Sequence, residues 1–99
     1  MSVDWHFEWD KHKASSNQAK HGVGFVEAVT VFQDFLAFIF DDELHSHQES
    51  RQTIIGHSDR NRLLLVSFSA RGDAIRLISA RKATAHERRE YERNQRARR

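Results

Sequence analysis

Arginine is the residue in this chain with the most chemistry to offer, and it gathers towards the C-terminal end. Residues 76–99 hold nine basic side chains against three acidic ones, whereas residues 1–75 hold seven basic side chains against eleven acidic ones. A guanidinium binds two phosphate oxygens at once and stays charged at any working pH. This distribution predicts that residues 76–99 bind a polyanion or an acidic protein. The alternative is a solvated helix face whose arginines pair with nearby glutamates.

Metal chemistry has little support in the sequence. The chain contains no cysteine, which excludes disulfides, thiolate zinc sites and cysteine nucleophiles. His45 and His47 could provide two metal ligands from an acidic loop, but the motif offers no third ligand and a zinc site needs about three or four. We therefore expect no metal and no cofactor.

The length and composition favour one small domain over residues 1–99. The mass is 11.6 kDa, and 30% of the residues are charged while 38% are hydrophobic. No apolar run approaches the roughly 20 residues of a membrane-spanning helix. The N-terminus also lacks the basic start and apolar stretch of a secretory signal. We therefore expect a cytoplasmic protein that does not bind membranes.

Two helices are expected after a short strand over residues 7–9. Asp10 is a suitable N-cap for a polar helix over residues 11–21, and Gly22 follows where a left-handed C-cap is wanted. Gly24 opens a second helix, in which apolar residues recur at i, i+3, i+4 and i+7. These apolar residues are Phe25, Ala28, Val29 and Phe32.

A continuous apolar run follows the second helix over residues 35–40. Its length suits a strand that is buried on both faces better than it suits a helix. We assign this run, together with Trp5 and Trp9, to the core.

Three further strands and a helix are expected in the second half of the chain. Residues 51–57 form a weaker strand, and residues 63–70 and 74–81 form the clearest strands, joined by a tight hairpin at Gly72. Thr84 and Glu87 have the spacing of a capping box that opens the last helix, whose basic tail over 93–99 is expected to fray. The order of elements predicts an α+β domain. It has a small antiparallel β-sheet, two N-terminal helices and one C-terminal helix, with the helices on one face of the sheet.

Two separated motifs resemble the BrnT toxin family, and together they cover the chain from about residue 7 to residue 92. The first consists of Phe7-Glu8-Trp9-Asp10, Lys13, Asn17 and Lys20-His21-Gly22. The second consists of Arg71-Gly72-Asp73, Arg76, Ile78-Ser79-Ala80-Arg81, Ala83-Thr84, Glu87-Arg88 and Tyr91-Glu92. Between them lie Arg51, Gly56 and Arg62-Leu63-Leu64. One departure is that Phe35 stands after Asp34, where the family often has a proline.

The resemblance implies a toxin of a bacterial type II toxin–antitoxin system with the fold of RelE-like ribonucleases. Such a toxin cleaves RNA and inhibits translation until a BrnA-like antitoxin with a ribbon-helix-helix domain neutralises it in a hetero-oligomer. The complex would reach operator DNA only through the antitoxin. The alternative is a catalytically inactive homologue that binds the antitoxin and serves in regulation of the operon.

RNA cleavage without a metal uses the 2′-hydroxyl as nucleophile, and it needs a base, an acid and cations around the phosphorane. Arg76 and Arg81 are the first candidates for the cations. Their positions differ in parity, so an unbroken strand would turn them to opposite faces. Either a bulge or the end of the strand redirects Arg81, or only one of the two contacts RNA. Alternatively, Arg81 is a structural arginine bonded to helix carbonyls.

Further candidates flank these arginines. Lys20 and His21 could take part in catalysis, with His21 as base or acid, although both types also favour helix C-termini. Tyr91 could stack on a base or donate a proton, or it could be a half-buried core residue. The side chains expected to bind the RNA are Arg62, Arg88 and Arg89.

Overall fold

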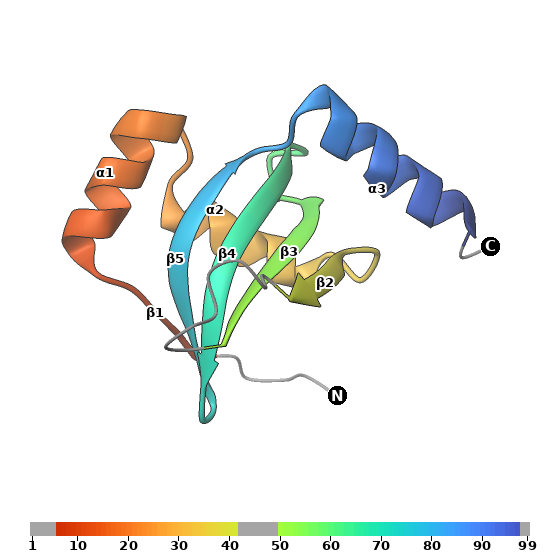
Figure 1. The fold of residues 1–99 in the computed structure, drawn as a ribbon. Helices are drawn as coiled ribbons and strands as arrows, with labels where there is room; N and C mark the ends of the chain where they lie inside the picture. The colour runs from red at the N-terminus through yellow and green to blue at the C-terminus, as the bar shows by residue number, and fades with distance from the viewer. Residues whose placement is uncertain (1–5, 42–49, 98–99) are drawn as a thin grey trace.

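A five-stranded sheet organises the chain, in the order β1-β5-β4-β3-β2 (Figure 1). The computed structural model describes residues 6–41 and 50–97. The N-terminal elements are β1 (His6–Glu8), α1 (Lys11–His21), α2 (Phe25–Thr30), the 3-10 helix η1 (Val31–Gln33) and β2 (Phe38–Asp41). The C-terminal elements are β3 (Arg51–His57), β4 (Leu63–Arg71), β5 (Ala74–Lys82) and α3 (Ala85–Ala97). No helix among these residues is long and apolar enough to cross a membrane.

Helix α1 begins and ends where the sequence places its caps. The carboxylate of Asp10 accepts hydrogen bonds from the backbone N–H groups of His12 (2.7 Å) and Lys13 (3.2 Å). Gly22 is left-handed at φ 69°, and its N–H donates to the carbonyl of Gln18 at 2.9 Å. Both predicted caps of this polar helix are confirmed.

The sheet is mixed, which corrects the expectation of an antiparallel sheet. Strands β2 to β5 pair antiparallel in sequence order, whereas β1 runs parallel to β5. A strand of three residues carries no signal for its partner, so packing decides it. The ring of Phe7 lies 5.0 Å from that of Phe32, and the ring of Trp9 lies 5.9 Å from that of Phe25. These contacts hold β1 against α2 and η1, beside β5.

One extra residue interrupts the ladder between β4 and β5. Phe68 pairs with Leu77, but the next pair joins Ser67 to Ser79, so Ile78 has no partner across the ladder. Such a β-bulge shifts the side-chain alternation of the strand by one residue. The faces of β5 are therefore counted separately before and after the bulge.

The main core lies between the sheet and helices α1 and α2. Figure 1 shows α2 crossing behind the strands and α1 standing beside β5. The strands contribute Ile54, Leu64, Val66, Phe68, Ile75, Leu77 and Ala80, and the helical segments contribute Val23, Phe25, Ala28 and Val31. Trp9 packs against this core as predicted.

Helix α3 packs on the opposite side of the sheet. Its residue Tyr91 is only 6% exposed and packs against Ile55 and Leu63. The expectation that all helices share one face is therefore wrong for α3. The helix also continues to Ala97, so residues 93–97 are helical where we expected fraying.

The apolar run over residues 35–40 is not a buried strand. Only Phe38–Asp41 forms a strand, and this strand, β2, is at the edge of the sheet. Phe35 is 91% exposed, Leu36 49%, Ile39 52% and Phe40 48%. A strand at a sheet edge has a neighbour on one side only, which leaves its side chains open to solvent. The prediction that this run belongs to the core is wrong for these four residues.

Some expectations lie outside the described residues. They concern Trp5 in the core, His45 and His47 as metal ligands, and Arg98 and Arg99 at the end of the basic tail.

Candidate functional site

The bulge in β5 brings Arg76 and Arg81 to the same face of the sheet. Arg76 pairs with Ser69 and Arg81 pairs with Leu65, and these two residues of β4 share a face. That face is the one not covered by α1 and α2, and we call it the open face. The parity conflict between the two arginines is therefore resolved by a bulge, one of the two solutions that the sequence allowed.

Arg81 is held by the start of α3. Its Nη1 and Nη2 donate to the two carboxylate oxygens of Glu87 at 2.7 and 2.8 Å. Glu87 also accepts from the backbone N–H of Thr84 at 2.9 Å, and the hydroxyl of Thr84 accepts from the N–H of Glu87 at 3.1 Å. The predicted capping box is thus confirmed. The Arg81 hydrogen bonds, with help from the Thr84 backbone, lower the pKa of Glu87 to about 2.

Arg76 differs from Arg81 in the contacts of its guanidinium. It is half-buried, and no hydrogen bond or ion pair joins its guanidinium to another part of the chain that the structure describes. Arg51 of β3 lies across Ser69 from it, because Ser69 pairs with Arg51 on one side and with Arg76 on the other. Two guanidinium groups therefore flank one small polar residue on the open face. This arrangement favours an anionic ligand.

An imidazole, a carboxylate and a phenol meet at the end of β3. The Nδ1 atom of His57 lies 3.8 Å from Oδ2 of Asp34 and 3.5 Å from the hydroxyl of Tyr91. The rings of His57 and Tyr91 meet edge to face with centroids 5.4 Å apart. The side chain of His57 is 36% exposed, whereas that of Asp34 is 17% exposed. A carboxylate and a phenol beside one ring nitrogen orient the imidazole and leave its other nitrogen for a ligand.

The position of Asp34 is fixed by two features of its surroundings. Its carboxylate accepts hydrogen bonds from the backbone N–H groups of His57 (2.8 Å) and Leu36 (3.0 Å). Gly56 lets this segment approach, because a Cβ there would lie 2.7 Å from the Cβ of Ala37 and 3.0 Å from Oδ2 of Asp34. The glycine next to His57 therefore keeps the carboxylate within reach of its ring.

Lys20 and His21 come from the last turn of α1. They line a groove of about 350 Å³ between α1 and β5, together with Lys13 and Ser79. Asn17 joins the two elements, since its amide donates to the carbonyl of Ala80 at 2.8 Å and accepts from the N–H of Ala80 at 3.0 Å. Ser79 belongs to the open face, so the basic groove opens onto that face two residues before Arg81.

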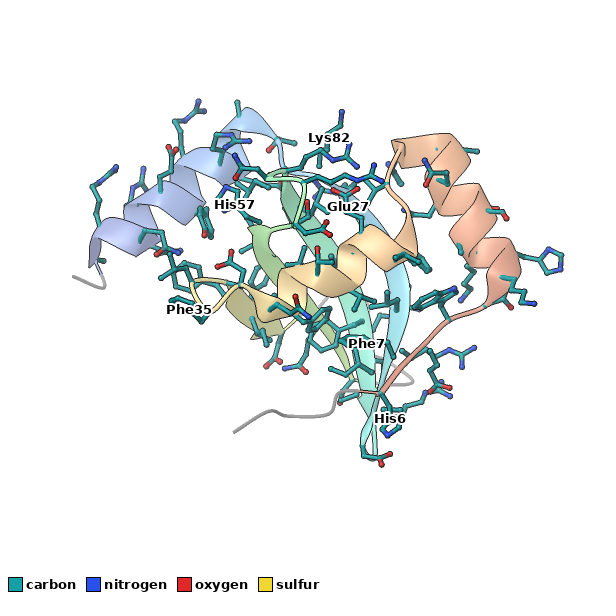
Figure 2. The ribbon with its side chains drawn as sticks, turned by 180° about the vertical axis from the view of Figure 1, so that it is seen from behind. His6, Phe7, Glu27, Phe35, His57 and Lys82 are labelled. Carbon is teal, nitrogen blue, oxygen red and sulfur yellow. The ribbon has the colours of Figure 1, made fainter. Side chains whose placement is uncertain are left out.

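Arg62 is bound inside the molecule. Its Nε donates to Oε2 of Glu27 at 2.9 Å, and its Nη2 donates to Oε1 of the same carboxylate and to the carbonyl of Gly22 at 3.2 Å. Ser58 donates to Glu27 as well, at 2.7 Å. Hydrogen bonds from Arg62 are the main cause of the lowered pKa of Glu27. Arg62 therefore fastens the β3–β4 turn to α2, on which Glu27 lies (Figure 2).

The other expected RNA-binding residues, Arg88 and Arg89, are exposed on α3. Neither makes an ion pair or hydrogen bond within residues 6–41 and 50–97. The same residues contain no cluster of three or more histidines and carboxylates that could hold a metal ion.

Sequence reasoning missed His57, Asp34 and Arg51 as members of the site. Asp34 and His57 are separated by 23 residues, and Tyr91 follows another 34 residues later. No local spacing links residues so far apart in the chain. A weak signal was available for Arg51, which is among the residues that carry the family resemblance.

The fold and the site define a class of small α+β proteins that place arginines and a histidine–carboxylate–tyrosine cluster on the side of a mixed sheet that α1 and α2 do not cover. Residues 9–87 match the family described as ribonuclease toxin, BrnT, of type II toxin-antitoxin system. The chain belongs to this family. Membership in such a system implies an antitoxin as partner.

A solved structure supports this relationship. The chain is similar to the crystal structure of the Brucella abortus ribonuclease toxin BrnT, with 30% sequence identity and a TM-score of 0.63. The match covers 83% of this chain and 99% of the Brucella protein. A comparison with curated proteins gave no match.

Proposed function

We propose that this toxin is a metal-independent endoribonuclease that cleaves RNA on the open face. The observation that carries the proposal is the bulge at Ile78, which supports a shared role for Arg76 and Arg81 on the side of the sheet that α1 and α2 leave uncovered. In this reaction the RNA 2′-oxygen bonds to the adjacent phosphorus and the bond to the 5′-oxygen breaks. The products carry a 2′,3′-cyclic phosphate and a 5′-hydroxyl.

His57 is the base of the proposed reaction. Its Nδ1 faces Asp34 and Tyr91, so Nε2 is the nitrogen available to remove the proton of the 2′-hydroxyl. Asp34 orients the ring and stabilises the imidazolium that forms. Tyr91 is buried in the second core cluster and cannot stack on a base of the RNA. We propose that its hydroxyl positions the ring of His57 or exchanges a proton with it.

The cations bind the phosphates of the RNA. Arg76 pairs through Ser69, six positions along β4 from the partner of His57, which is about 20 Å, so it binds a phosphate away from the cleaved bond. Its guanidinium has no competing partner in the described part of the chain. Arg81 lies closer to His57, opposite Leu65, but Glu87 offsets its charge, so it binds a phosphate only in competition with that carboxylate. Lys20 extends the cationic surface along the groove beside α1, where it and the imidazole of His21 bind the RNA.

The outer arginines of the proposed site have different roles. Arg88 and Arg89 of α3 bind RNA phosphates, because both are exposed and without ion pairs in the described residues. Arg62 supports the site from beneath, because Glu27 and Gly22 occupy its guanidinium. We therefore propose it as a structural residue rather than an RNA ligand.

The wider function follows the family. We propose a single domain with a RelE-like arrangement, acting in the cytoplasm, where it inhibits translation by cutting RNA. The proposed partner is a BrnA-like ribbon-helix-helix antitoxin, which neutralises the toxin in a hetero-oligomer and links it to operator DNA.

The test is RNA cleavage by the purified chain in the presence of EDTA. We expect cleavage to survive chelation and to leave 2′,3′-cyclic phosphate or 3′-phosphate ends. His57→Gln should lower kcat by about 10²–10⁴-fold and remove the limb of the pH–rate profile that reports the base. Activity that is lost with EDTA and restored by zinc would refute the metal-free mechanism. A folded chain that binds antitoxin and cleaves nothing would be an inactive homologue.

A further inference from the structure

The exposed apolar surface at the edge of the sheet is the strongest feature that RNA cleavage leaves unexplained. It consists of Phe35, Leu36, Ile39 and Phe40, which we call the β2 patch. The patch includes both faces of the edge, because Ile39 and Phe40 are successive strand residues and point to opposite faces of the sheet. The two residues between them, Ala37 and Phe38, pack inwards against the two core clusters. The segment is therefore anchored, and it still presents four large apolar side chains to solvent. A cluster of this kind marks a protein interface more often than it marks free surface.

The β2 patch has the backbone of an edge strand. In the sheet order β1-β5-β4-β3-β2, strand β2 has β3 on one side and no other described strand on the opposite side. An edge strand can add a further strand from a partner, whose main chain then pairs along its outer edge. Apolar side chains of the partner would cover the patch in the same step.

The charges beside the patch indicate the partner's chemistry. Helix α3 lies next to it: the amide of Gln95 donates to the carbonyl of Leu36 at 2.6 Å, and the ring of Tyr91 lies 5.9 Å from that of Phe38. Figure 2 shows Phe35 at the α3 side of the molecule. The exposed arginines of this helix are Arg88, Arg89, Arg93 and Arg96. An apolar strip beside exposed arginines is complementary to a segment that carries apolar side chains flanked by carboxylates.

We propose that the antitoxin docks on the β2 patch through an extended segment that runs beside β2 and points carboxylates towards α3. This proposal rests on the antitoxin partnership that family membership implies, and it does not require that the chain cleave RNA. A segment there lies close to the proposed base, because Phe38 contacts Tyr91, and Tyr91 contacts His57. Docking would therefore cover the phosphate-binding arginines of α3 and restrict access to the imidazole.

The experiment measures binding of the purified full-length chain to the protein encoded by the adjacent gene. The variant is F35S/F40S, and the matched control is Val26→Ser, because Val26 is 75% exposed and lies on α2. We expect affinity for the antitoxin to fall at least about 30-fold in the patch variant. We expect it to stay unchanged in the control, and we expect both variants to cleave RNA like the parent. Parent-like affinity of the patch variant would overturn the proposal.

Hydrogen exchange on the unmodified chain gives a second readout that does not depend on the folding of a variant. Antitoxin should protect the amides of residues 35–41 and of α3. Protection confined to α1 and α2 would overturn the proposal. If the free chain forms a dimer and F35S/F40S makes it monomeric, the β2 patch binds a second copy of the chain. That result would also overturn the proposal. If the parent chain does not cleave RNA, the proposed ribonuclease mechanism is refuted, but the binding result can still be interpreted.

Discussion

Arg76 allows catalysis to be separated from folding, since no hydrogen bond or ion pair to the described residues depends on its guanidinium. We predict that Arg76→Gln lowers kcat/KM for RNA cleavage by about 10–100-fold, the usual effect of removing a hydrogen bond to a charged group. The melting temperature should not change. Single-turnover kinetics and thermal unfolding measure the two effects.

The control for this substitution is Arg60→Gln, which removes the same charge from an exposed position in the β3–β4 turn. It should cleave RNA at the parent rate. Equal losses in both variants would mean that Arg76 acts only through net charge.

Glu87 provides a prediction about pH. Its pKa is lowered from 4.5 to about 2 in the folded protein, so the unfolded chain binds the proton more tightly. The stabilisation from the Arg81 pair is therefore fully present above about pH 4.5 and is lost as the pH falls from there towards 2. Part of the effect is screened by water, because the Arg81 side chain is 41% exposed.

Urea unfolding of the parent and of Glu87→Gln between pH 6 and pH 3 tests how the stabilisation from the Arg81–Glu87 pair depends on pH. The free energy of unfolding should fall more steeply with acid in the parent than in the variant, and the two should converge at low pH. Parallel curves for the two proteins would show that Glu87 does not contribute to the acid sensitivity.

At the level of single residues, the sequence predicted what depends on local spacing. The pairing of Thr84 with Glu87 follows from three positions on a helix, and it is confirmed. For Arg81 the sequence left open a phosphate ligand or a structural arginine bonded to helix carbonyls, and it did not predict the carboxylate of Glu87 as the partner. The contact between His57 and Asp34 could not be predicted from the sequence, because it depends on how closely β3 approaches the turn after η1.

At the level of elements, Asn17 determines how α1 docks. Its side-chain amide pairs with the backbone N–H and C=O of Ala80 as a neighbouring strand would, and it also donates to the carbonyl of Val23 at 2.9 Å. Asn17→Ala leaves these buried groups without a partner, and we predict a loss of about 1–3 kcal/mol in the free energy of unfolding.

Ser16→Ala is the matched control, because Ser16 is exposed on the same helix. Its stability should stay within about 0.5 kcal/mol of the parent. Denaturant unfolding gives both values, and a cost for Asn17→Ala no larger than that of the control would contradict the docking role.

The elements that were predicted correctly have residues that mark their ends, and the elements that were predicted wrongly have none. Asp10 and Gly22 mark both ends of α1 by their side-chain and backbone chemistry. The run over residues 35–40 is apolar without being buried, because a composition suited to a core is equally suited to an interface. The parallel placement of β1 depends on ring contacts with α2 and η1 that no pattern within three residues could reveal.

At the level of the whole molecule, positive charge is concentrated on the open face and α3 although the net charge is only +2. Binding of a non-cleavable 2′-O-methyl RNA should therefore weaken as salt rises. Each phosphate contact contributes about 0.7 to the slope of log K against log salt. We predict that R88Q/R89Q reduces the magnitude of the slope by about 1.4.

Fluorescence anisotropy across a salt series measures this slope. A suitable comparison is Arg71→Gln in the β4–β5 hairpin, which is exposed and lies at the far end of β4 from α3. It should leave the slope unchanged. If R88Q/R89Q also leaves it unchanged, α3 does not contact RNA phosphates.

The unpaired Ile78 divides β5 into two stretches whose side-chain alternation differs by one residue. Every residue of β5 after Ile78 therefore faces the side opposite to the one that an unbroken strand would give it. Deletion of Ile78 would restore a continuous ladder and leave Arg76 and Arg81 four residues apart, so both would stay on the open face without a bulge. A relative that kept the spacing of five residues but paired Ile78 into the ladder would instead turn the two arginines to opposite faces and lack the site.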